Sequence, residues 1–172
     1  MILEPLDPGP DHALPGEVLT EVTELYAAHR EFFALSGDFP DPDGITAAQV
    51  AVALADELAQ PGAEVLLARA GGRLAGIAVT LERHPDPADP DPWIGLLMID
   101  PARQRRGLGR ELASAVEERF RAAGRTAVRL AVLDANTQAL AFWTALGYTE
   151  IDRRADIQRG RPCRVLRKQL AR

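Results

Sequence analysis

The seven residues from Gln104 to Arg110 combine glycines with basic side chains in a pattern suited to binding an anion. They lie between an apolar run and an amphipathic segment, so we expect them at the turn from a strand into a helix. Gly107 and Gly109 let the backbone bend and approach a ligand closely. The first amides of a helix lack an intrahelical partner and carry the positive end of its dipole. The sequence therefore predicts a phosphate-binding turn.

Two other interpretations of this turn have to be weighed. A basic strand-to-helix turn without a ligand also uses glycines for its geometry, and a lone Gly-x-Gly pair does not separate the two. A nicotinamide-binding turn needs a third glycine, where this chain has Leu112. Such a turn also follows its strand directly, whereas the residues from Asp100 to Arg106 intervene here. The dinucleotide interpretation is therefore disfavoured.

A second block of residues makes the interpretation of the glycine turn more specific. The stretch from Asn136 to Tyr148 reads Asn-x-x-Ala-x-x-Phe-Trp-x-x-x-Gly-Tyr. The turn from Gln104 to Gly109 matches the signature Gln/Arg-x-x-Gly-x-Gly/Ala, and the two blocks with the preceding strand cover about residues 93 to 150. In this combination the chain resembles the GCN5-related N-acetyltransferase (GNAT) family.

The resemblance implies a fold of the α/β (α+β) class, with a mixed, mostly antiparallel central sheet, about four flanking helices and a V-shaped splay between the two central strands. It also implies acetyl-CoA as the cosubstrate, inserted between the strands that end at Ile99 and near Leu133. The amides of the turn would hold its diphosphate, and the strand before the turn would bind its pantetheine arm. Asn136 and Trp143 would flank the thioester. The cofactor-binding residues implied in this way are Leu97, Met98, Ile99, Gln104, Arg105, Arg106, Gly107, Leu108, Gly109, Arg110, Asn136, Ala139, Phe142 and Trp143.

Members of the family bring amine and thioester together for direct attack, so positioning carries much of the catalysis. The oxyanion that develops needs a fixed donor, for which the backbone N–H of Met98 or Ile99 is the candidate. Two familiar bases are missing, because histone-type relatives have a glutamate where this chain has Trp93, and ribosomal-protein N-terminal acetylators have one at the position of Ala131. The tyrosine that often protonates the leaving thiolate is Trp143 here, whose indole cannot supply a proton.

The catalytic proton acceptor must therefore lie elsewhere. Asp91 and Glu82 flank a loop at the strand edges, and we take them as candidate bases, although most loop carboxylates are simply solvated. His84 in the same loop is a rival, because its ordinary pKa suits proton transfer near neutrality. Tyr148 and Tyr26 stay open as general acids, with packing as the alternative role for Tyr148.

Acidic residues gather in two loops that we place at the rim of the acceptor cleft. The loops 37–44 and 84–92 each contain three aspartates, so they would steer a cationic amine toward the cleft. Phe32, Phe33 and Phe39 either shape the acceptor pocket, as the resemblance implies, or pack in the core.

The hydrophobic pattern indicates the elements that position these residues. Apolar residues recur at helical spacing over 17–35, over 46–58, from Leu108 to a stop at Gly124, and over 136–146. Strand patterns cover 1–6, 64–70, 73–81, 93–99, 127–133, 149–156 and 163–169. Gly71-Gly72 predicts a two-residue hairpin. This order predicts a mixed sheet with helices on its faces.

Length, charge and cysteine count bear on the number of domains, the partners, the metal sites and the location of the protein. A chain of 172 residues with 47% hydrophobic positions fits one domain, 1–172. A net charge of −5 disfavours nucleic acid as a partner, and no apolar run approaches the roughly 20 residues of a membrane helix. Cys163 stands alone, and His12, His29 and His84 lie too far apart for a local metal motif. The first residues do not form a signal peptide, so we expect a cytoplasmic protein, and the resemblance is compatible with a homodimer.

The leading hypothesis is an N-acetyltransferase that acts on a primary amine of a small-molecule or peptide acceptor. The alternative is a non-catalytic acyl-CoA-binding sensor or regulatory module, which the missing glutamate and tyrosine positions favour. A dimeric interaction scaffold with an empty cleft is the third hypothesis.

Overall fold

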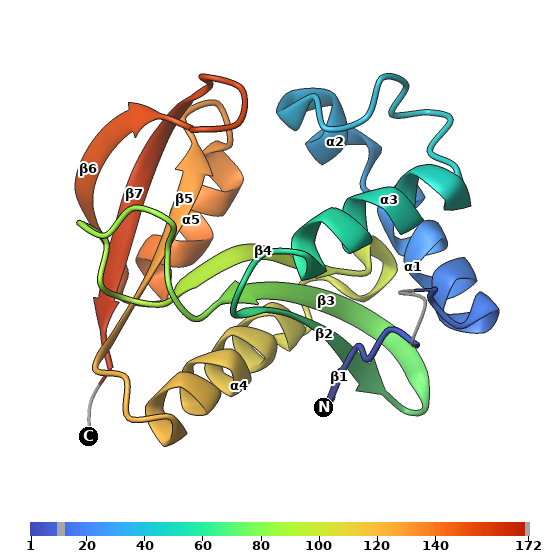
Figure 1. The fold of residues 1–172 in the computed structure, drawn as a ribbon, viewed down its shortest axis with the longest axis horizontal. Coiled ribbons are helices and arrows are strands. Elements are labelled where there is room, and N and C mark those ends of the chain that lie inside the picture. The colour runs from blue at the N-terminus through green and yellow to red at the C-terminus, as the bar shows by residue number, and fades with distance from the viewer. Residues whose placement is uncertain (10–12, 171–172) are drawn as a thin grey trace.

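The computed structural model describes residues 1–9 and 13–170 of the chain (Figure 1). The helices are α1 (Gly16–Ala28), α2 (Arg30–Ser36), α3 (Ala47–Leu58), α4 (Leu108–Ala122) and α5 (Thr137–Ala145), with a 3₁₀ turn at Pro101–Arg103. The strands are β1 (Ile2–Pro5), β2 (Ala63–Ala70), β3 (Arg73–Leu81), β4 (Trp93–Ile99), β5 (Ala127–Leu133), β6 (Thr149–Ala155) and β7 (Pro162–Gln169). Within these ranges no helix has the length and apolar character needed to cross a membrane. His12 lies outside the described residues.

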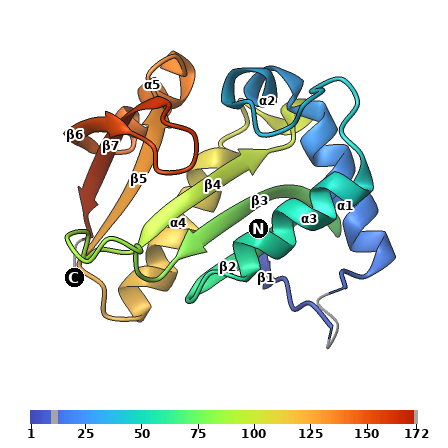
Figure 2. The same ribbon diagram turned by 45° about the horizontal axis from the view of Figure 1, so that its top comes forward.

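The seven strands form one sheet in the order β1-β2-β3-β4-β5-β7-β6. Every neighbouring pair is antiparallel except β4 and β5, which run parallel at the centre. Figures 1 and 2 show α1, α2 and α3 on one side of the β1–β4 half of the sheet and α4 on the other side. The predicted fold class is confirmed, and the described part of the chain has five α-helices where about four were predicted.

Alternate residues of the strands enter two separate hydrophobic cores. In β2, Leu66 packs in the core that contains Leu112 of α4, whereas Val65 and Leu67 pack in the core that contains Leu54 of α3. A strand points successive side chains to opposite faces, so both faces of this sheet are covered. This explains why the central strands read as continuous apolar runs in the sequence.

The single helix predicted over 17–35 is in fact two helices. The backbone leaves helical geometry at His29, with φ −99° and ψ 35°, and α2 begins at Arg30. Nε2 of His29 lies 2.9 Å from the carbonyl oxygen of Ile99, a tertiary contact that no local pattern encodes. The break between the two helices therefore sits against the C-terminal end of β4.

The hairpin predicted at Gly71-Gly72 is confirmed. Both glycines have left-handed backbone, with φ of 62° and 77°, and the flanking residues Ala70 and Arg73 pair with each other. A two-residue turn needs positive φ at both central positions, which glycine adopts at little steric cost.

Candidate active site

The two central strands pair over only two positions before they part. Trp93 pairs with Arg129 and Ile94 with Leu130, and no further pair joins β4 to β5. Figure 2 shows the two ribbons diverging from this point toward their C-terminal ends. The predicted V-shaped splay between the central strands is confirmed.

A β-bulge in β4 marks the apex of the splay. Ile94 and Leu96 pair with consecutive residues of β3, so Gly95 between them has no partner. A bulge bends its strand and raises the local twist, which turns β4 away from β5. Gly95 and Ala131 of β5 are both exposed although they lie in the two central strands. The apex of the splay is therefore open and lined by small residues.

Beyond the bulge, the backbone of β4 presents an open edge. The N–H of Asp100 donates to the carbonyl oxygen of Ala75 at 2.9 Å, and the pairing with β3 stays in register before it. Bonded and non-bonded pairs alternate in an antiparallel ladder, so Met98 bonds to β3. Leu97 and Ile99 point their N–H and C=O groups away from β3. Because β5 does not pair with β4 here, a ligand can reach the N–H groups of both residues and the C=O of Leu97.

This register separates the two predicted oxyanion donors. The N–H of Met98 is used by the ladder with β3, whereas the N–H of Ile99 faces the splay. The carbonyl oxygen of Ile99 confirms the direction, because it lies 2.9 Å from Nε2 of His29 and accepts from Nε2 of Gln104 at 3.3 Å. Ile99 and Leu97 therefore supply the available donors.

The turn before α4 has the geometry of an anion-binding loop. Gly107 is the N-cap of α4 with φ 83°, and no side chain caps this end of the helix. A Cβ at Gly107 would meet no atom within 4 Å, so the space beside it is open. The helix amides from Leu108 to Arg110 have neither intrahelical partner nor cap, and they lie at the positive end of the dipole. Arg105, with φ 63°, is the one described non-glycine residue with left-handed backbone.

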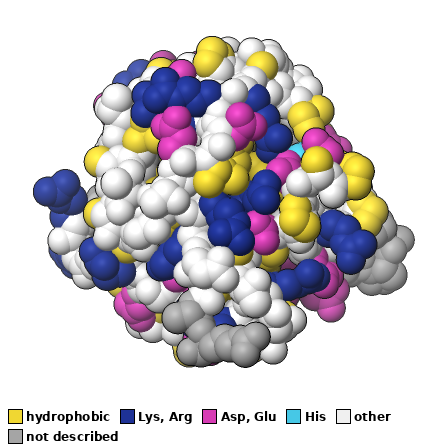
Figure 3. All heavy atoms as spheres, turned by 90° about the vertical axis from the view of Figure 1, so that its left-hand side faces the viewer, with side chains coloured by type: hydrophobic (Ala, Val, Ile, Leu, Met, Phe, Trp, Pro, Cys, Tyr) yellow, Lys and Arg dark blue, Asp and Glu magenta, His cyan; other side chains and the backbone are white. Residues whose placement is uncertain are grey.

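Three arginines of this turn lack the ionic partners that most arginines of the protein have. Arg105, Arg106 and Arg110 are exposed, and within residues 1–9 and 13–170 no carboxylate pairs with them. Arg103, just before them, lies 3.6 Å from Asp100. On the face that carries β6, Figure 3 shows basic side chains next to acidic ones. Free guanidinium groups at one helix start, in a protein of net charge −5, favour a bound polyanion.

The two sequence blocks meet at the start of α4. A Cβ at Gly109 would lie 3.3 Å from Phe142 of α5 and 3.8 Å from Ile99 of β4. Asn136 caps α5, because its side-chain oxygen accepts from the N–H of Ala139 at 3.1 Å. The fold thus brings the turn, the open edge of β4 and the start of α5 together at the mouth of the splay.

A family model described as the acetyltransferase (GNAT) family matches residues 22–148. The chain belongs to the GNAT family. Enzymes of this family use acetyl-CoA as the acetyl donor. The matched range contains both blocks at the mouth of the splay.

Solved GNAT structures share the fold over nearly the whole chain. An acetyltransferase from Thermus thermophilus matches with a TM-score of 0.72 at 21% identity, over 99% of this chain and 98% of that one. YncA, a putative acetyltransferase from Salmonella typhimurium solved with acetyl-CoA, matches at 0.65 and 18% identity, over 100% and 95%. The ribosomal-protein-S18-alanine N-acetyltransferase from Escherichia coli matches at 0.64 and 18%, over 99% and 94%. A search of curated proteins finds no match.

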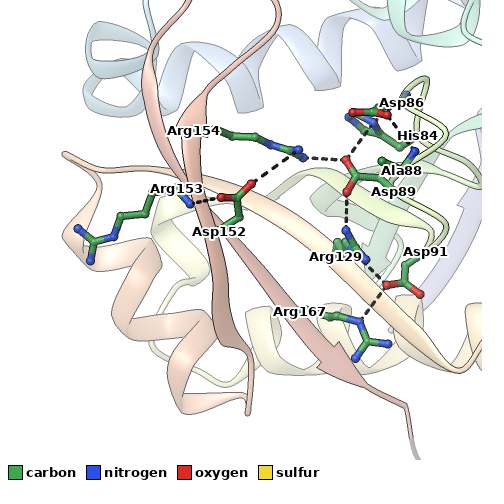
Figure 4. A network of polar contacts seen from close by, with 10 residues as sticks. All are labelled: His84, Asp86, Ala88, Asp89, Asp91, Arg129, Asp152, Arg153, Arg154 and Arg167. Atoms are coloured by element: carbon green, nitrogen blue, oxygen red, sulfur yellow. Dashed lines mark hydrogen bonds and ion pairs between the residues drawn. The ribbon is translucent and has the colours of Figure 1, made fainter.

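Asp91, a predicted base, is held between two guanidinium groups. Its carboxylate accepts from Nε of Arg129 at 2.8 Å and from Nε of Arg167 at 2.9 Å (Figure 4). Burial acts to raise the pKa of Asp91, but the hydrogen bonds from Arg167 and Arg129 outweigh it and lower the pKa below its ordinary value. A carboxylate held ionised in this way is a weak proton acceptor. The structure therefore argues against Asp91 as the base.

Asp91 belongs to a network that ties the β3–β4 loop to the C-terminal strands. Buried Asp89 accepts from Arg129 and from Arg154, the latter at 2.8 Å, and lies 3.3 Å from Nδ1 of His84. Figure 4 shows the arginines reaching from the strands to the loop. Neither here nor elsewhere in the described chain could a group of three or more His, Cys, Asp or Glu hold a metal ion. The network is therefore best described as an anchor for the loop.

Replacing Asp91 with asparagine is expected to lower the melting temperature at neutral pH. Since the folded-state pKa of Asp91 is lowered, its ion pairs add stability above the unfolded pKa of about 3.9, and this stability is lost as the pH falls through the folded pKa. The variant should therefore be less stable at pH 7 and approach the wild type in strong acid. Thermal unfolding across this pH range measures the effect, with exposed Asp7→Asn as the control. An equal loss at every pH would contradict the prediction.

The other two candidate bases lie in different surroundings. Glu82 pairs with Arg125 at 2.6 Å, in the turn before β5, which is the end of the sheet opposite the opening of the splay. The structure therefore argues against Glu82 as well. The ring of His84 lies 4.6 Å from that of Trp93, and its Nδ1 accepts from the N–H of Asp86 at 3.1 Å. Burial lowers the pKa of His84, so it is neutral at pH 7 and stays a candidate.

Tyr148 has a packing role. Its hydroxyl donates to Glu117 at 3.0 Å, and Lys168 binds the other oxygen of that carboxylate at 2.7 Å. Burial and the charge of Glu117 raise the pKa of Tyr148. The ring packs 4.9 Å from Trp143 in the core beneath α4. A phenol buried against a carboxylate cannot easily deliver a proton to a leaving group in the splay.

The acidic loops are largely neutralised. Asp43 pairs with Arg30 at 2.5 Å, and Asp38 pairs with Arg161 at 3.2 Å. The loop 84–92 has its two innermost aspartates bound by arginines, as described above. The predicted attraction of a cationic amine to these loops therefore loses most of its basis.

His29 is a site residue that the sequence did not single out. Its Nε2 contacts the carbonyl oxygen of Ile99, 70 positions along the chain. Burial lowers the pKa of His29, so the ring is neutral and its proton is on Nε2, the nitrogen that donates to this oxygen. No sequence signal could have found it, because the contact joins a helix break to a distant strand end.

Proposed function

We propose that the chain is an N-acetyltransferase that transfers an acetyl group from acetyl-CoA to a primary amine of a small-molecule or peptide acceptor. One observation carries this proposal: the turn with free helix amides lies at the open end of the splay, where a Cβ at Gly109 would lie 3.8 Å from Ile99. CoA needs both features side by side, because it has a diphosphate and an amide-bearing arm. The first pairs with helix amides, and the second can add to a free strand edge.

The groups at the splay match the diphosphate and the amide-bearing arm of acetyl-CoA in their chemistry. The amides after Gln104, together with the free arginines of the turn, would bind the diphosphate. The outward N–H and C=O groups of Leu97 and the outward N–H of Ile99 would bond the pantetheine amides as a neighbouring strand would. Acetyl-CoA supplies an acetyl group activated as a thioester. Asn136 and Trp143 would flank this end, and Ala139 and Phe142 are further candidates for binding CoA.

A cavity on the other side of the splay offers room for the acceptor. It has a volume of about 210 Å³ and lies at the C-terminal end of β5, lined by Leu35, Leu133, Asp134, Ala135, Arg161 and Pro162. Arg161 and Arg159 donate to the carbonyl groups of Ser36 and Gly37 at the end of α2, so the β6–β7 turn is tied to α2 here. The acceptor amine would reach the thioester through this cavity. Among structures of similar fold, one is an aminoglycoside 6′-acetyltransferase and one acetylates a ribosomal-protein alanine.

Thiol release from acetyl-CoA in the presence of a panel of amines tests the proposal. The panel includes polyamines, aminoglycosides, peptides with free N-termini and acidic amines, and acetylated products are identified by mass spectrometry. Tight CoA binding without any acetylated product would instead support a non-catalytic acyl-CoA-binding module. The absence of the familiar bases at Trp93 and Ala131 is the observation that favours this second function. No thermal shift with acetyl-CoA would contradict both functions.

Replacing Arg105 and Arg110 with glutamine is expected to weaken CoA binding about tenfold and to reduce its salt dependence, since free guanidinium groups attract phosphate. Isothermal titration of CoA at low and high salt measures both effects. Arg119→Gln is the control, because Arg119 lies on α4 as Arg110 does but pairs with Glu64 at 2.7 Å. If Arg119→Gln weakened CoA binding as much, the affinity would depend on the net charge of the protein and not on the arginines of the turn.

A further inference from the structure

The acceptor cavity lies between α2 and the end of β5. Helix α2 begins directly after His29, whose ring contacts the carbonyl oxygen of Ile99 on the open edge of β4. Leu35 of this helix lines the cavity, and so does Leu133, the last residue of β5. One part of the lining is therefore attached to β4 and another belongs to β5, so the cavity spans the mouth of the splay (Figure 2).

The cavity also adjoins the place proposed for the thioester. The N–H of Asn136 donates to the carbonyl oxygen of Leu133 at 2.8 Å, which closes a tight turn with Asp134 and Ala135 at its centre. The N–H of Asp134 donates to the carbonyl oxygen of Pro162 at 3.0 Å, so this turn is also held to β7. Ala135 lines the cavity and directly precedes Asn136, which the proposed function places beside the thioester. A molecule in the cavity would therefore have one end close to the acetyl group.

Most of the residues that line the cavity are apolar and take no part in the hydrophobic cores. Of the six described residues that line it, four have apolar side chains, and these are Leu35, Leu133, Ala135 and Pro162. Neither core of the described chain includes any of these four, and Leu35 is 41% exposed although it is a large hydrophobic residue. Apolar side chains around a concave surface outside the core are typical of a ligand site. The cavity therefore suits an apolar group.

The charged side chains that line the cavity are already neutralised by ion pairs. Nε of Arg161 lies 2.5 Å from Asp156, and another of its nitrogens lies 3.2 Å from Asp38. Asp134 accepts from Nε of Arg164 at 3.0 Å. A second charge on the acceptor would lose water in the cavity without gaining a free counter-ion, which is unfavourable. The pairing therefore disfavours both polycations and acidic amines.

The size of the cavity limits the acceptor to a small molecule. Arg159 and Arg161 donate to the carbonyl oxygens of Gly37 and Ser36, and these bonds tie the β6–β7 turn to the end of α2 (Figure 1). The tie closes one side of the cavity, so an extended peptide cannot continue in that direction. A cavity of about 150 Å³ with apolar walls takes up benzene. The volume of about 210 Å³ therefore leaves room for an aromatic ring or a chain of about six carbon atoms.

We propose that the acceptor is a small primary amine whose body is uncharged and apolar, and that this cavity binds the body while the amine faces the thioester. This inference rests on the proposed function and names the class of its acceptor. Leu35 and Ala135 determine the specificity, because they line the cavity from α2 and from the turn before α5. The neutralised acidic loops agree with this class, because they leave little to attract a cationic body.

Three amines of nearly equal length that differ at the far end test this class. Hexylamine ends in a methyl group, hexanediamine in a second ammonium group and aminohexanoate in a carboxylate. The kcat/KM for hexylamine is expected to exceed that for each of the other two at least about tenfold, because the charged groups of the cavity are already paired. From ethylamine to hexylamine, kcat/KM should rise about threefold per methylene until the cavity is full.

Replacing Leu35 with asparagine tests the part of the cavity formed by α2, since the two side chains have a similar shape and only leucine is apolar. The ratio of kcat/KM for hexylamine to that for ethylamine should fall about fivefold, whereas a general loss of folded protein would leave this ratio unchanged. Val52→Asn on α3 is the matched control, because Val52 is also an apolar helix residue, 61% exposed, and does not line the cavity. Ala135→Leu should lower the same ratio, because leucine takes up space that the longer amine needs.

The outcomes distinguish this inference from the proposed function. If hexanediamine, aminohexanoate or peptides with free N-termini react better than hexylamine, the apolar acceptor is wrong while the acetyltransferase function stands. If hexylamine reacts best but Leu35→Asn and Ala135→Leu both keep the wild-type ratio, the assignment of the acceptor to this cavity is wrong. If acetyl-CoA binds and no amine is acetylated, the enzymatic function and the acceptor class fall together.

Discussion

Replacing Gly107 with valine is expected to remove most of the affinity for CoA while the protein stays folded. Gly107 has φ 83°, a conformation that costs an L-residue about 1–2 kcal/mol and a β-branched residue more, so the turn must change shape. The side chain would also occupy the open space beside the first amides of α4. A loss of at least about tenfold in Kd is expected, measured by isothermal titration calorimetry with CoA.

Gly124→Val is the matched control for this experiment. Gly124 lies just beyond the other end of α4, with φ 76° and no atom within 4 Å of a Cβ. Both variants therefore introduce the same backbone strain in open surroundings and should lose similar melting temperature. Only Gly107→Val should lose CoA affinity. If both variants bind CoA as the wild type does, the anion-binding turn is wrongly placed, and the proposed function loses its main support.

Gly76→Ala is expected to destabilise the protein more than alanine at Gly95, the other glycine of the strands. A Cβ at Gly76 would lie 2.7 Å from Cδ1 of Ile99 and closer still to the carbonyl oxygen of Met98, which is backbone and cannot rotate away. β4 must therefore shift. Overpacking of this kind costs about 3 kcal/mol, measured as the free energy of unfolding in urea.

The same substitution also tests how β4 contributes to binding. Because Gly76 contacts the part of β4 that faces the splay, its variant should weaken CoA binding as well as lower stability. Gly16→Ala is the control, since a Cβ there meets nothing within 4 Å and alanine favours the helix that begins at this residue. Unchanged stability in Gly76→Ala would show that the contact between β3 and β4 is looser than the structure indicates.

Local sequence patterns predicted most of the helices, strands and turns, because each pattern follows from a requirement on neighbouring residues. Gly71-Gly72 marked its hairpin, since a tight turn requires positive φ at two adjacent residues. The stripe that includes Leu112 and Val116 marked α4, since one face of that helix is buried. The break at His29 was missed, because the contact that accompanies it is with a strand far along the chain.

The surroundings of the two candidate carboxylates could not be predicted from the sequence. Asp91 and Glu82 were chosen for their positions at strand edges, but each is paired with an arginine that is distant in sequence. Whether a carboxylate is free or paired follows from tertiary contacts and not from its own segment.

The sequence by itself determined the family, the order of helices and strands, and the turn from Gln104 to Arg110, because glycine geometry, helix amides and hydrophobic period act over a few neighbouring residues. Only the tertiary structure decided where β4 and β5 part, which backbone groups of β4 face the gap, and which acidic side chains are paired with arginines. The splay depends on strand register, which the single bulge at Gly95 changes. The state of each carboxylate depends on charges brought together from distant positions in the sequence, and one arginine can change it.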